Sequence, residues 1–89
     1  MAETVNIHVK YLSAIRDKVG HRDETASFPQ GTTLQDLQTW LNNLYSLSVP
    51  DPGIMLTLND KGWGQLPEDL STELKDGDVI CIFPIISGG

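Results

Sequence analysis

Cations, cysteines and long apolar runs are all scarce in this chain of 89 residues. Six Lys and Arg stand against twelve Asp and Glu, which gives a net charge of −6. This balance argues against binding to nucleic acid, whose phosphates attract clustered cations, and favours a partner with a basic docking surface. No apolar run approaches the roughly 20 residues that cross a bilayer, and the N-terminus carries no signal pattern. We therefore expect a cytoplasmic protein with no membrane partner.

Groups that could perform catalysis are equally few. Cys81 is the single cysteine, so an internal disulfide and a multi-cysteine metal site are both excluded, and its apolar neighbours predict a buried structural thiol. His8 and His21 lack a cysteine or second histidine at metal-ligand spacing. The chain shows no catalytic triad, paired carboxylates or phosphate loop. We expect it to bind no metal or cofactor itself, and to supply a substrate rather than an active site.

The first half of the chain predicts two strands and two helices. Alternation of apolar and polar residues predicts a strand over residues 5–11, and helical spacing predicts a short helix from Leu12 to Val19, with Gly20 as its terminator. A second strand follows and stops at Pro29. Thr32 and Gln35 fit a capping box for the main helix. Its predicted apolar face carries Leu34, Leu37, Leu41 and Leu44, with Trp40 and Tyr45 beside them.

The second half predicts three strands. Residues 54–58 alternate as a strand, residues 59–62 form its turn, and residues 63–66 return as a short strand. A tight turn at residues 75–78 leads into the last strand, residues 79–83, which is apolar on both faces. Such a strand belongs in the middle of a sheet. One main helix on a five-stranded mixed sheet is an α+β design, and this element order predicts the β-grasp, ubiquitin-like fold, with a short extra helix after strand one.

The whole chain also resembles the small subunits of molybdopterin synthase, in the MoaD/ThiS family of ubiquitin-like sulfur carriers. The most specific part is the sequence LKDGDV at residues 74–79, followed by Phe83-Pro84 and the ending Ser87-Gly88-Gly89. The sequence YLSAIRDKVG at residues 11–20 resembles the segment after the first strand of the family. Two features depart from the pattern. Ile85 follows Pro84 where a second proline is common, and the hairpin at residues 59–64 differs in form, which bears on partner choice.

This resemblance implies a sulfur-transfer cycle at Gly89. An ATP-dependent, E1-like adenylating enzyme would activate the C-terminal carboxylate, and a sulfur donor such as a cysteine desulfurase or rhodanese would convert it to a thiocarboxylate. The large subunit of molybdopterin synthase, in a heterotetramer, would then pass this sulfur to a cyclic pterin precursor of the molybdenum cofactor. The chain itself would be a non-catalytic, sulfur-donating subunit that uses ATP only through its activating enzyme.

The ending also suits this cycle physically. Glycine lacks a Cβ, so Ser87 and Gly88 would thread a narrow channel and bring Gly89 to the reacting centre. We expect residues 1–83 to form the domain and residues 84–89 an extended tail, because Pro84 has no N–H and ends the strand ladder.

Residues at the base of this tail have two interpretations. They either complete the core at the end of the last strand or form an apolar anchor for a partner. The core is favoured for Phe83 and the interface for Ile85 and Ile86. The candidate partner-binding residues are Phe83, Pro84, Ile85 and Ile86.

Three other functions stay open. The chain could carry sulfur for another pathway, such as thiamine thiazole or tungsten-cofactor synthesis. It could be a ubiquitin-like modifier that joins Gly89 to a lysine of another protein. It could also be a plain binding module whose glycine pair is incidental.

Overall fold

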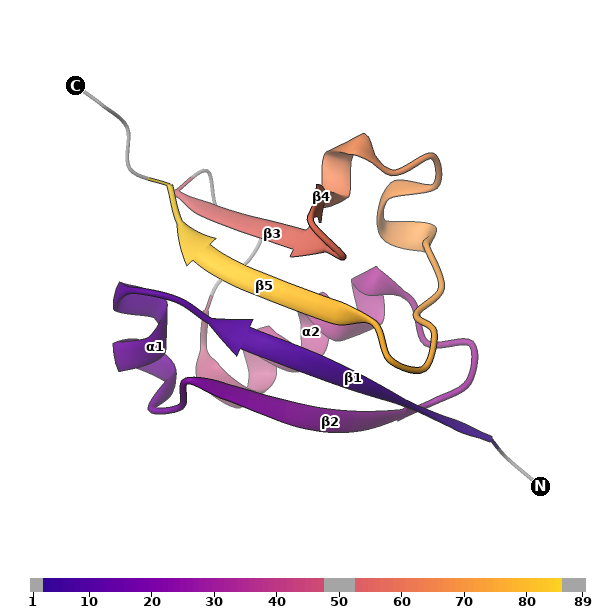
Figure 1. Cartoon of the computed structure of the whole chain (residues 1–89), viewed down its shortest axis with the longest axis horizontal. Helices are drawn as coiled ribbons and strands as arrows, with labels where there is room; N and C mark the ends of the chain where they lie inside the picture. The colour runs from indigo at the N-terminus through magenta and orange to yellow at the C-terminus, as the bar shows by residue number, and fades with distance from the viewer. Residues whose placement is uncertain (1–2, 48–52, 86–89) are drawn as a thin grey trace.

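The computed structural model describes residues 3–47 and 53–85, and it contains a five-stranded sheet with α2 packed across one face (Figure 1). The elements in chain order are β1 (Thr4–Tyr11), α1 (Ala14–Val19), β2 (Asp23–Pro29), α2 (Leu34–Tyr45), β3 (Ile54–Leu58), β4 (Lys61–Gly62), the 3₁₀ helices η1 (Trp63–Gln65) and η2 (Asp69–Ser71), and β5 (Val79–Pro84). The strand order is β2-β1-β5-β3-β4, with β1 parallel to β5 and the other pairs antiparallel. The predicted β-grasp fold is confirmed, and β5 is a central strand.

One face of the sheet and one face of α2 make the core. The buried side chains include Val5, Ile7, Val9 and Tyr11 of β1, Leu56 and Leu58 of β3, Ile80 and Ile82 of β5, and Leu34, Leu37 and Leu41 of α2. Burying each large aliphatic side chain stabilises the fold by about 1.5–3 kcal/mol. Leu44 was wrongly predicted to join this stripe and is 53% exposed. At this end of α2 the core is completed by Tyr45 and by Leu47, just past the helix.

Both helices begin later than the sequence predicts. The N-cap of α2 is Thr33, whose Oγ1 accepts a 3.3 Å hydrogen bond from the amide of Asp36, while the Asp36 carboxylate accepts one of 3.1 Å from the amide of Thr33. Thr32 cannot serve as the cap because its hydroxyl donates to the carbonyl of Pro29 in the preceding turn. Leu12 lies outside α1, since its amide still donates to Ile82 of the sheet. Gly20 ends α1 as predicted, with φ of 88°.

The predicted return strand over residues 63–66 is wrong. The return strand is β4, which pairs with Thr57 and Leu58 across a two-residue turn. Asn59 and Asp60 form this turn, with φ of 50° and 73°. The chain then curls into η1, which places the Trp63 side chain in the core. The pairing of this edge therefore ends after two residues.

The turn before β5 fixes where this strand starts. The Asp78 carboxylate accepts a hydrogen bond of 2.7 Å from the amide of Lys75, and Gly77 takes the positive φ of the turn. The Asp76 carboxylate accepts a second bond, of 2.8 Å, from the amide of Asn6 in β1. The LKDGDV sequence is therefore accounted for by folding chemistry. None of the helices in the described part of the chain is long and apolar enough to span a membrane.

Candidate functional site

The predicted site residues fall on both sides of the limit of the described chain. Phe83, Pro84 and Ile85 are described, whereas Ile86, Ser87, Gly88 and Gly89 lie outside the described residues. The site can therefore be built from the end of β5 and from the elements that surround it.

The pairing of β5 with β1 ends before Pro84, whereas the pairing of β5 with β3 includes Pro84. Even-numbered residues of β5 direct their backbone N–H and C=O groups towards β1, as the hydrogen bond from the Leu12 amide to the Ile82 carbonyl shows. The missing N–H of Pro84 is therefore on the side where β1 has already ended. Odd-numbered residues direct their backbone groups towards β3, and on that side the Ile85 amide donates a hydrogen bond of 2.8 Å to the carbonyl of Gly53. β5 therefore ends at Pro84, as expected, and one further backbone bond, to Gly53, follows it on the β3 side.

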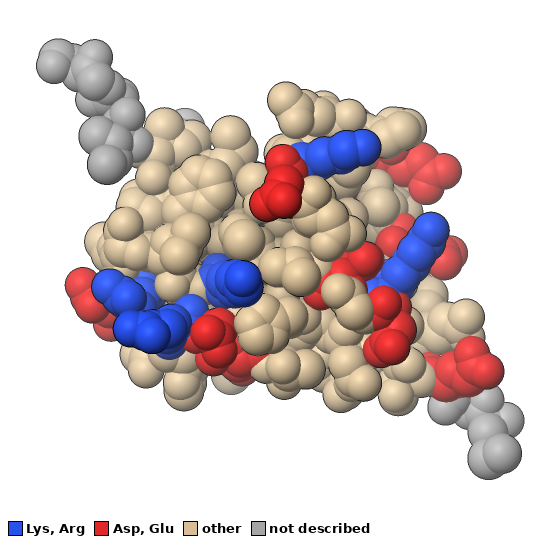
Figure 2. Space-filling view, viewed as in Figure 1, with Lys and Arg blue, Asp and Glu red and all other residues tan. Residues whose placement is uncertain are grey.

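A row of apolar side chains crosses three strands at this end of the sheet, on the face away from α2. Met55 of β3 pairs with Phe83 of β5, and Leu12 follows the Tyr11–Ile82 pair and so lies on the other side of Phe83. Ile85 continues the same alternation along β5. We call these four residues (Leu12, Met55, Phe83 and Ile85) the outer patch. Figure 2 shows this face, where uncharged surface extends towards the C-terminal end of the chain.

Exposure distinguishes the outer patch from an ordinary half-buried sheet surface. Leu12, Met55 and Ile85 are 44%, 39% and 45% exposed, and they are three of the four large apolar side chains that are exposed in the described chain. Phe83 is partly buried and lies outside the core, so its favoured assignment to the core is wrong. The cause is that β5 is covered by α2 on one face alone. Contiguous exposed apolar residues of this kind mark interaction surfaces.

Sequence reasoning missed Leu12 and Met55. A signal for Met55 was present, since an apolar residue occupied an outward position of an alternating strand. Leu12 was assigned to the apolar face of a helix that in fact begins at Ala14.

The next row of the same face is more polar. It runs from Lys10 through Cys81 to Thr57. Cys81 is partly buried on this outer face, so the expected burial of its thiol in the core is wrong. The outer patch is therefore confined to the end of the sheet where β5 finishes.

Charge is divided unevenly along the chain. Residues 10–24 hold four of the six Lys and Arg residues but three of the twelve Asp and Glu residues. These cations, Lys10, Arg16, Lys18 and Arg22, are all exposed. Arg16 and Lys18 belong to α1, which follows Leu12 of the outer patch, and Figure 2 shows Lys and Arg side chains gathered at this end of the molecule. The surface near the outer patch is therefore locally cationic, and complementarity there favours an acidic rim on a partner rather than the basic one inferred from net charge.

A hydrogen-bonded cluster on the α2 side stabilises this end of the sheet. Glu24 of β2 accepts a bond of 2.7 Å from the hydroxyl of Tyr11 and a second one from the hydroxyl of Tyr45. Burial raises the pKa of Tyr11 well above its ordinary value, and the bond to Glu24 adds to this effect. The pKa of Tyr45 is raised for the same two reasons. Because both phenols stay protonated at neutral pH, the cluster serves to hold β1, β2 and α2 together.

Comparisons with solved structures place this fold among small ubiquitin-like proteins. A putative molybdopterin converting factor, subunit 1, from Pyrococcus furiosus superposes with a TM-score of 0.77 at 24% identity, covering 92% of this chain and 99% of that one. The small archaeal modifier protein 1 from Methanosarcina acetivorans gives 0.76 at 24% identity, covering 98% and 99%. The complex of subunits 1 and 2 of the molybdopterin-converting factor from Helicobacter pylori gives 0.64 at 24% identity, covering 96% and 100%.

Sequence comparison assigns the family. None of the curated proteins matches the sequence. The profile of the ThiS family matches residues 9–89. Since this match takes in β1 from Val9 onward and every later element, the chain belongs to the ThiS family, the ThiS/MoaD type of ubiquitin-like sulfur carriers.

Proposed function

We propose that this chain carries sulfur as a thiocarboxylate on Gly89 and delivers it in molybdopterin synthesis, as the small subunit of molybdopterin synthase. The observation that carries the proposal is the outer patch, which lies where β5 ends and where the chain continues to its two glycines. The ThiS family match supports it, because this match extends through residue 89.

The chemistry starts from an unreactive group. A terminal carboxyl has a pKa of about 3.3–3.7, so at neutral pH it is a carboxylate and a poor electrophile. Attack of this carboxylate on ATP releases pyrophosphate and leaves an acyl-adenylate. Sulfide, or a persulfide donor together with a thiol reductant, then displaces AMP and leaves a thiocarboxylate. This sulfur bonds to a carbon of the pterin precursor, from which an oxygen substituent leaves, and water then cleaves the acyl–sulfur bond to restore the carboxylate and leave the sulfur on the pterin.

The large subunit of molybdopterin synthase is the partner that we propose for the outer patch. The Helicobacter pylori neighbour is a complex of subunits 1 and 2 of its factor, which supports a partner of this kind. Met55, Phe83 and Ile85 would lie against an apolar surface of the large subunit while Ser87 and Gly88 thread towards its active site. The cations of residues 10–24 would meet an acidic rim. The E1-like adenylating enzyme must bind the same C-terminal end of the chain, so the enzyme and the large subunit would bind in turn.

Sulfur delivery to a defined acceptor tests this proposal. The chain is prepared as its thiocarboxylate and mixed with the large subunit and the cyclic pterin precursor, and dithiolene product is measured by mass spectrometry. We expect product in proportion to loaded chain, and none from the carboxylate form. A loaded chain that yields no product here but supports thiazole formation would assign it to thiamine synthesis instead.

Protein modification is the second candidate. The Methanosarcina acetivorans neighbour is named a modifier protein, and activation of Gly89 would begin in the same way. The two functions differ in the acceptor, which is a lysine amine for a modifier. Conjugates of this chain that survive denaturation and contain a Gly89 isopeptide would favour modification.

A further inference from the structure

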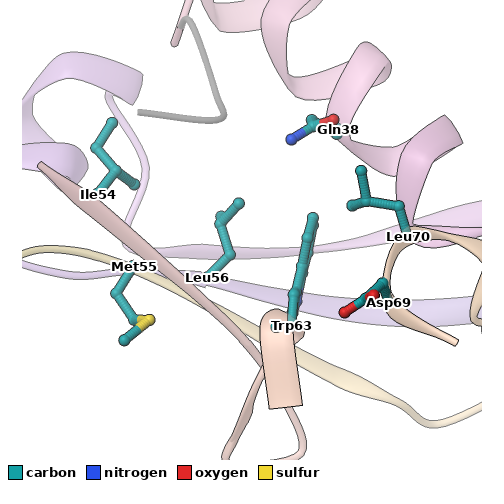
Figure 3. Close-up of a pocket in the computed structure, with 8 residues that line it drawn as sticks. Gln38, Ile54, Met55, Leu56, Trp63, Asp69 and Leu70 are labelled. Atoms are coloured by element: carbon teal, nitrogen blue, oxygen red, sulfur yellow. The ribbon is translucent and has the colours of Figure 1, made fainter. Parts of the chain in front are cut away.

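A second surface lies at the opposite edge of β3, between this strand and α2. It is a groove of ≈ 450 Å³, within the range of about 300–1,000 Å³ that is typical of ligand sites. Figure 3 shows Ile54 and Leu56 rising from one face of β3 into the groove, while Met55 points the other way. Trp63 and Leu70 stand opposite Leu56. The groove is therefore walled by large apolar side chains.

Among the described residues, the first half of β3 has no strand partner on the side of this groove. Gly53 and Asn59 both bond to β5, so odd-numbered residues of β3 direct their N–H and C=O groups towards β5. Ile54 and Leu56 therefore direct theirs to the opposite edge. There β4 pairs with Thr57 and Leu58 alone, and within residues 3–47 and 53–85 no strand pairs with this edge at Ile54 to Leu56. Figure 1 shows the first half of β3 as the border of the sheet.

Residues 54–56 of this edge carry no lysine, proline or bulge. Soluble proteins block free edges with lysine, proline or a bulge, because an unpaired edge accepts further strands. Ile54, Met55 and Leu56 are all apolar and regular in their pairing to β5. An apolar free edge beside an apolar groove is the arrangement that binds extended peptides by strand addition.

Polar groups in the groove indicate the charge of its ligand. Gln38 of α2 is 8% exposed and brings a side-chain amide to the groove wall. Asp69 also lines the groove, is exposed, and has neither a hydrogen bond nor an ion pair from its carboxylate within the described chain. Glu68 precedes it. A basic side chain on the ligand would therefore complement this end of the groove.

We propose that the free edge of β3 and this groove bind an extended segment of a partner protein, in which an apolar residue is flanked by lysine or arginine. The segment pairs with the backbone of Ile54 and with the amide of Leu56, whose carbonyl lies opposite Trp63 in the register of the β3–β4 hairpin, and it inserts its apolar side chain between Leu56 and Leu70. A second copy of this chain is disfavoured as the occupant, because each copy carries a net charge of −6 and its own Asp69 at the edge. Met55 lines both this groove and the outer patch, so the two surfaces meet at β3, whereas Leu12, Phe83 and Ile85 do not line the groove.

The test uses a blocked synthetic peptide in which isoleucine and valine alternate with lysine. We expect NMR shifts at Ile54, Leu56 and Leu70, and slower amide exchange at Ile54 and Leu56 when the peptide binds. N-methylation of the peptide amides that face β3 removes the strand pairing and should weaken binding at least about tenfold. Asp69→Lys should weaken it by a similar factor, whereas the matched Glu68→Lys, next to the groove, should have a smaller effect.

Three results would overturn the proposal. These are an absence of binding by the peptide, equal binding by its N-methylated form, and shifts confined to the outer patch. Light scattering on the chain without peptide tests whether a second copy of the chain occupies the edge instead. A dimer with protected Ile54 and Leu56 amides in the absence of peptide would assign the edge to self-association.

Discussion

The backbone amide of Ile85 donates a hydrogen bond of 2.8 Å to the carbonyl oxygen of Gly53, one residue beyond Pro84. The sheet therefore holds the chain in an extended path up to a residue that is 45% exposed. Ile85 is thus presented by a fixed backbone, which lowers the entropy that a partner must remove on binding.

Ile85→Asp tests the outer patch. It should weaken binding to the large synthase subunit at least about tenfold, because truncating a central apolar anchor costs more than about 2 kcal/mol and the new carboxylate would be desolvated. Leu44→Asp is the matched control, since Leu44 is 53% exposed on α2, on the other side of the sheet. Titration calorimetry measures both. Equal affinity of the two variants for the large subunit would show that the outer patch is not part of the interface.

Gly88→Val tests the demand for a slender ending. A β-branched side chain widens the chain and restricts its backbone, so sulfur transfer should fall sharply. The melting temperature should stay within about a degree of the parent, because every core residue of the described chain lies between Val5 and Ile82. Transfer assays and thermal melts on the same sample separate the two effects. Unimpaired transfer would show that the partner channel is wide.

Thr33→Ala tests the cap of α2. Loss of the capping hydroxyl should lower the free energy of unfolding by about 0.5–2 kcal/mol. Gln35→Ala should leave it nearly unchanged, because Gln35 is exposed and the capping partner is Asp36. Urea unfolding compares the two variants. A larger loss of unfolding free energy for Gln35→Ala would favour Thr32 and Gln35 as the capping pair, as the sequence alone indicated.

Tyr11→Phe tests the buried phenol through its pH dependence. The pKa of Tyr11 is raised in the folded chain, so the folded state retains a proton that the unfolded state releases above about pH 10. The resulting stability is fully present below this pH and is lost as the pH rises further. Thermal melts from neutral to alkaline pH should show a steeper decline for the parent chain than for the variant. Parallel declines would contradict the raised pKa.

Much of the fold was predictable because it follows from local patterns. Alternation identified β1 and β3, and the Asp-Gly-Asp turn placed the start of β5. The cap of α2 was misplaced because Thr32 and Thr33 both fit an N-cap, and the choice depends on the bond from Thr32 to Pro29, which exists only once β2 has ended. The return strand was misplaced because burial of Trp63 turns the chain into η1.

The site was predictable only along one strand. Phe83 and Ile85 could be proposed from their position before the glycines. Leu12 and Met55 join them through strand pairing between residues far apart in sequence, which no local pattern reports. Phe83 lies outside the core because only one face of β5 is covered. The sequence does not indicate this, since an apolar strand has the same pattern whether one or both of its faces are packed.

Intact mass measurement of the activated chain tests the central claim most directly. The chain is incubated with the E1-like adenylating enzyme that the proposal requires, ATP and sulfide, and the product is fragmented. We predict a mass increase equal to the difference between one sulfur and one oxygen atom, located on Gly89, and no increase when ATP is omitted. An unchanged mass, or sulfur attached to Cys81, would contradict the account of this chain as a carrier of sulfur on its C-terminal carboxylate.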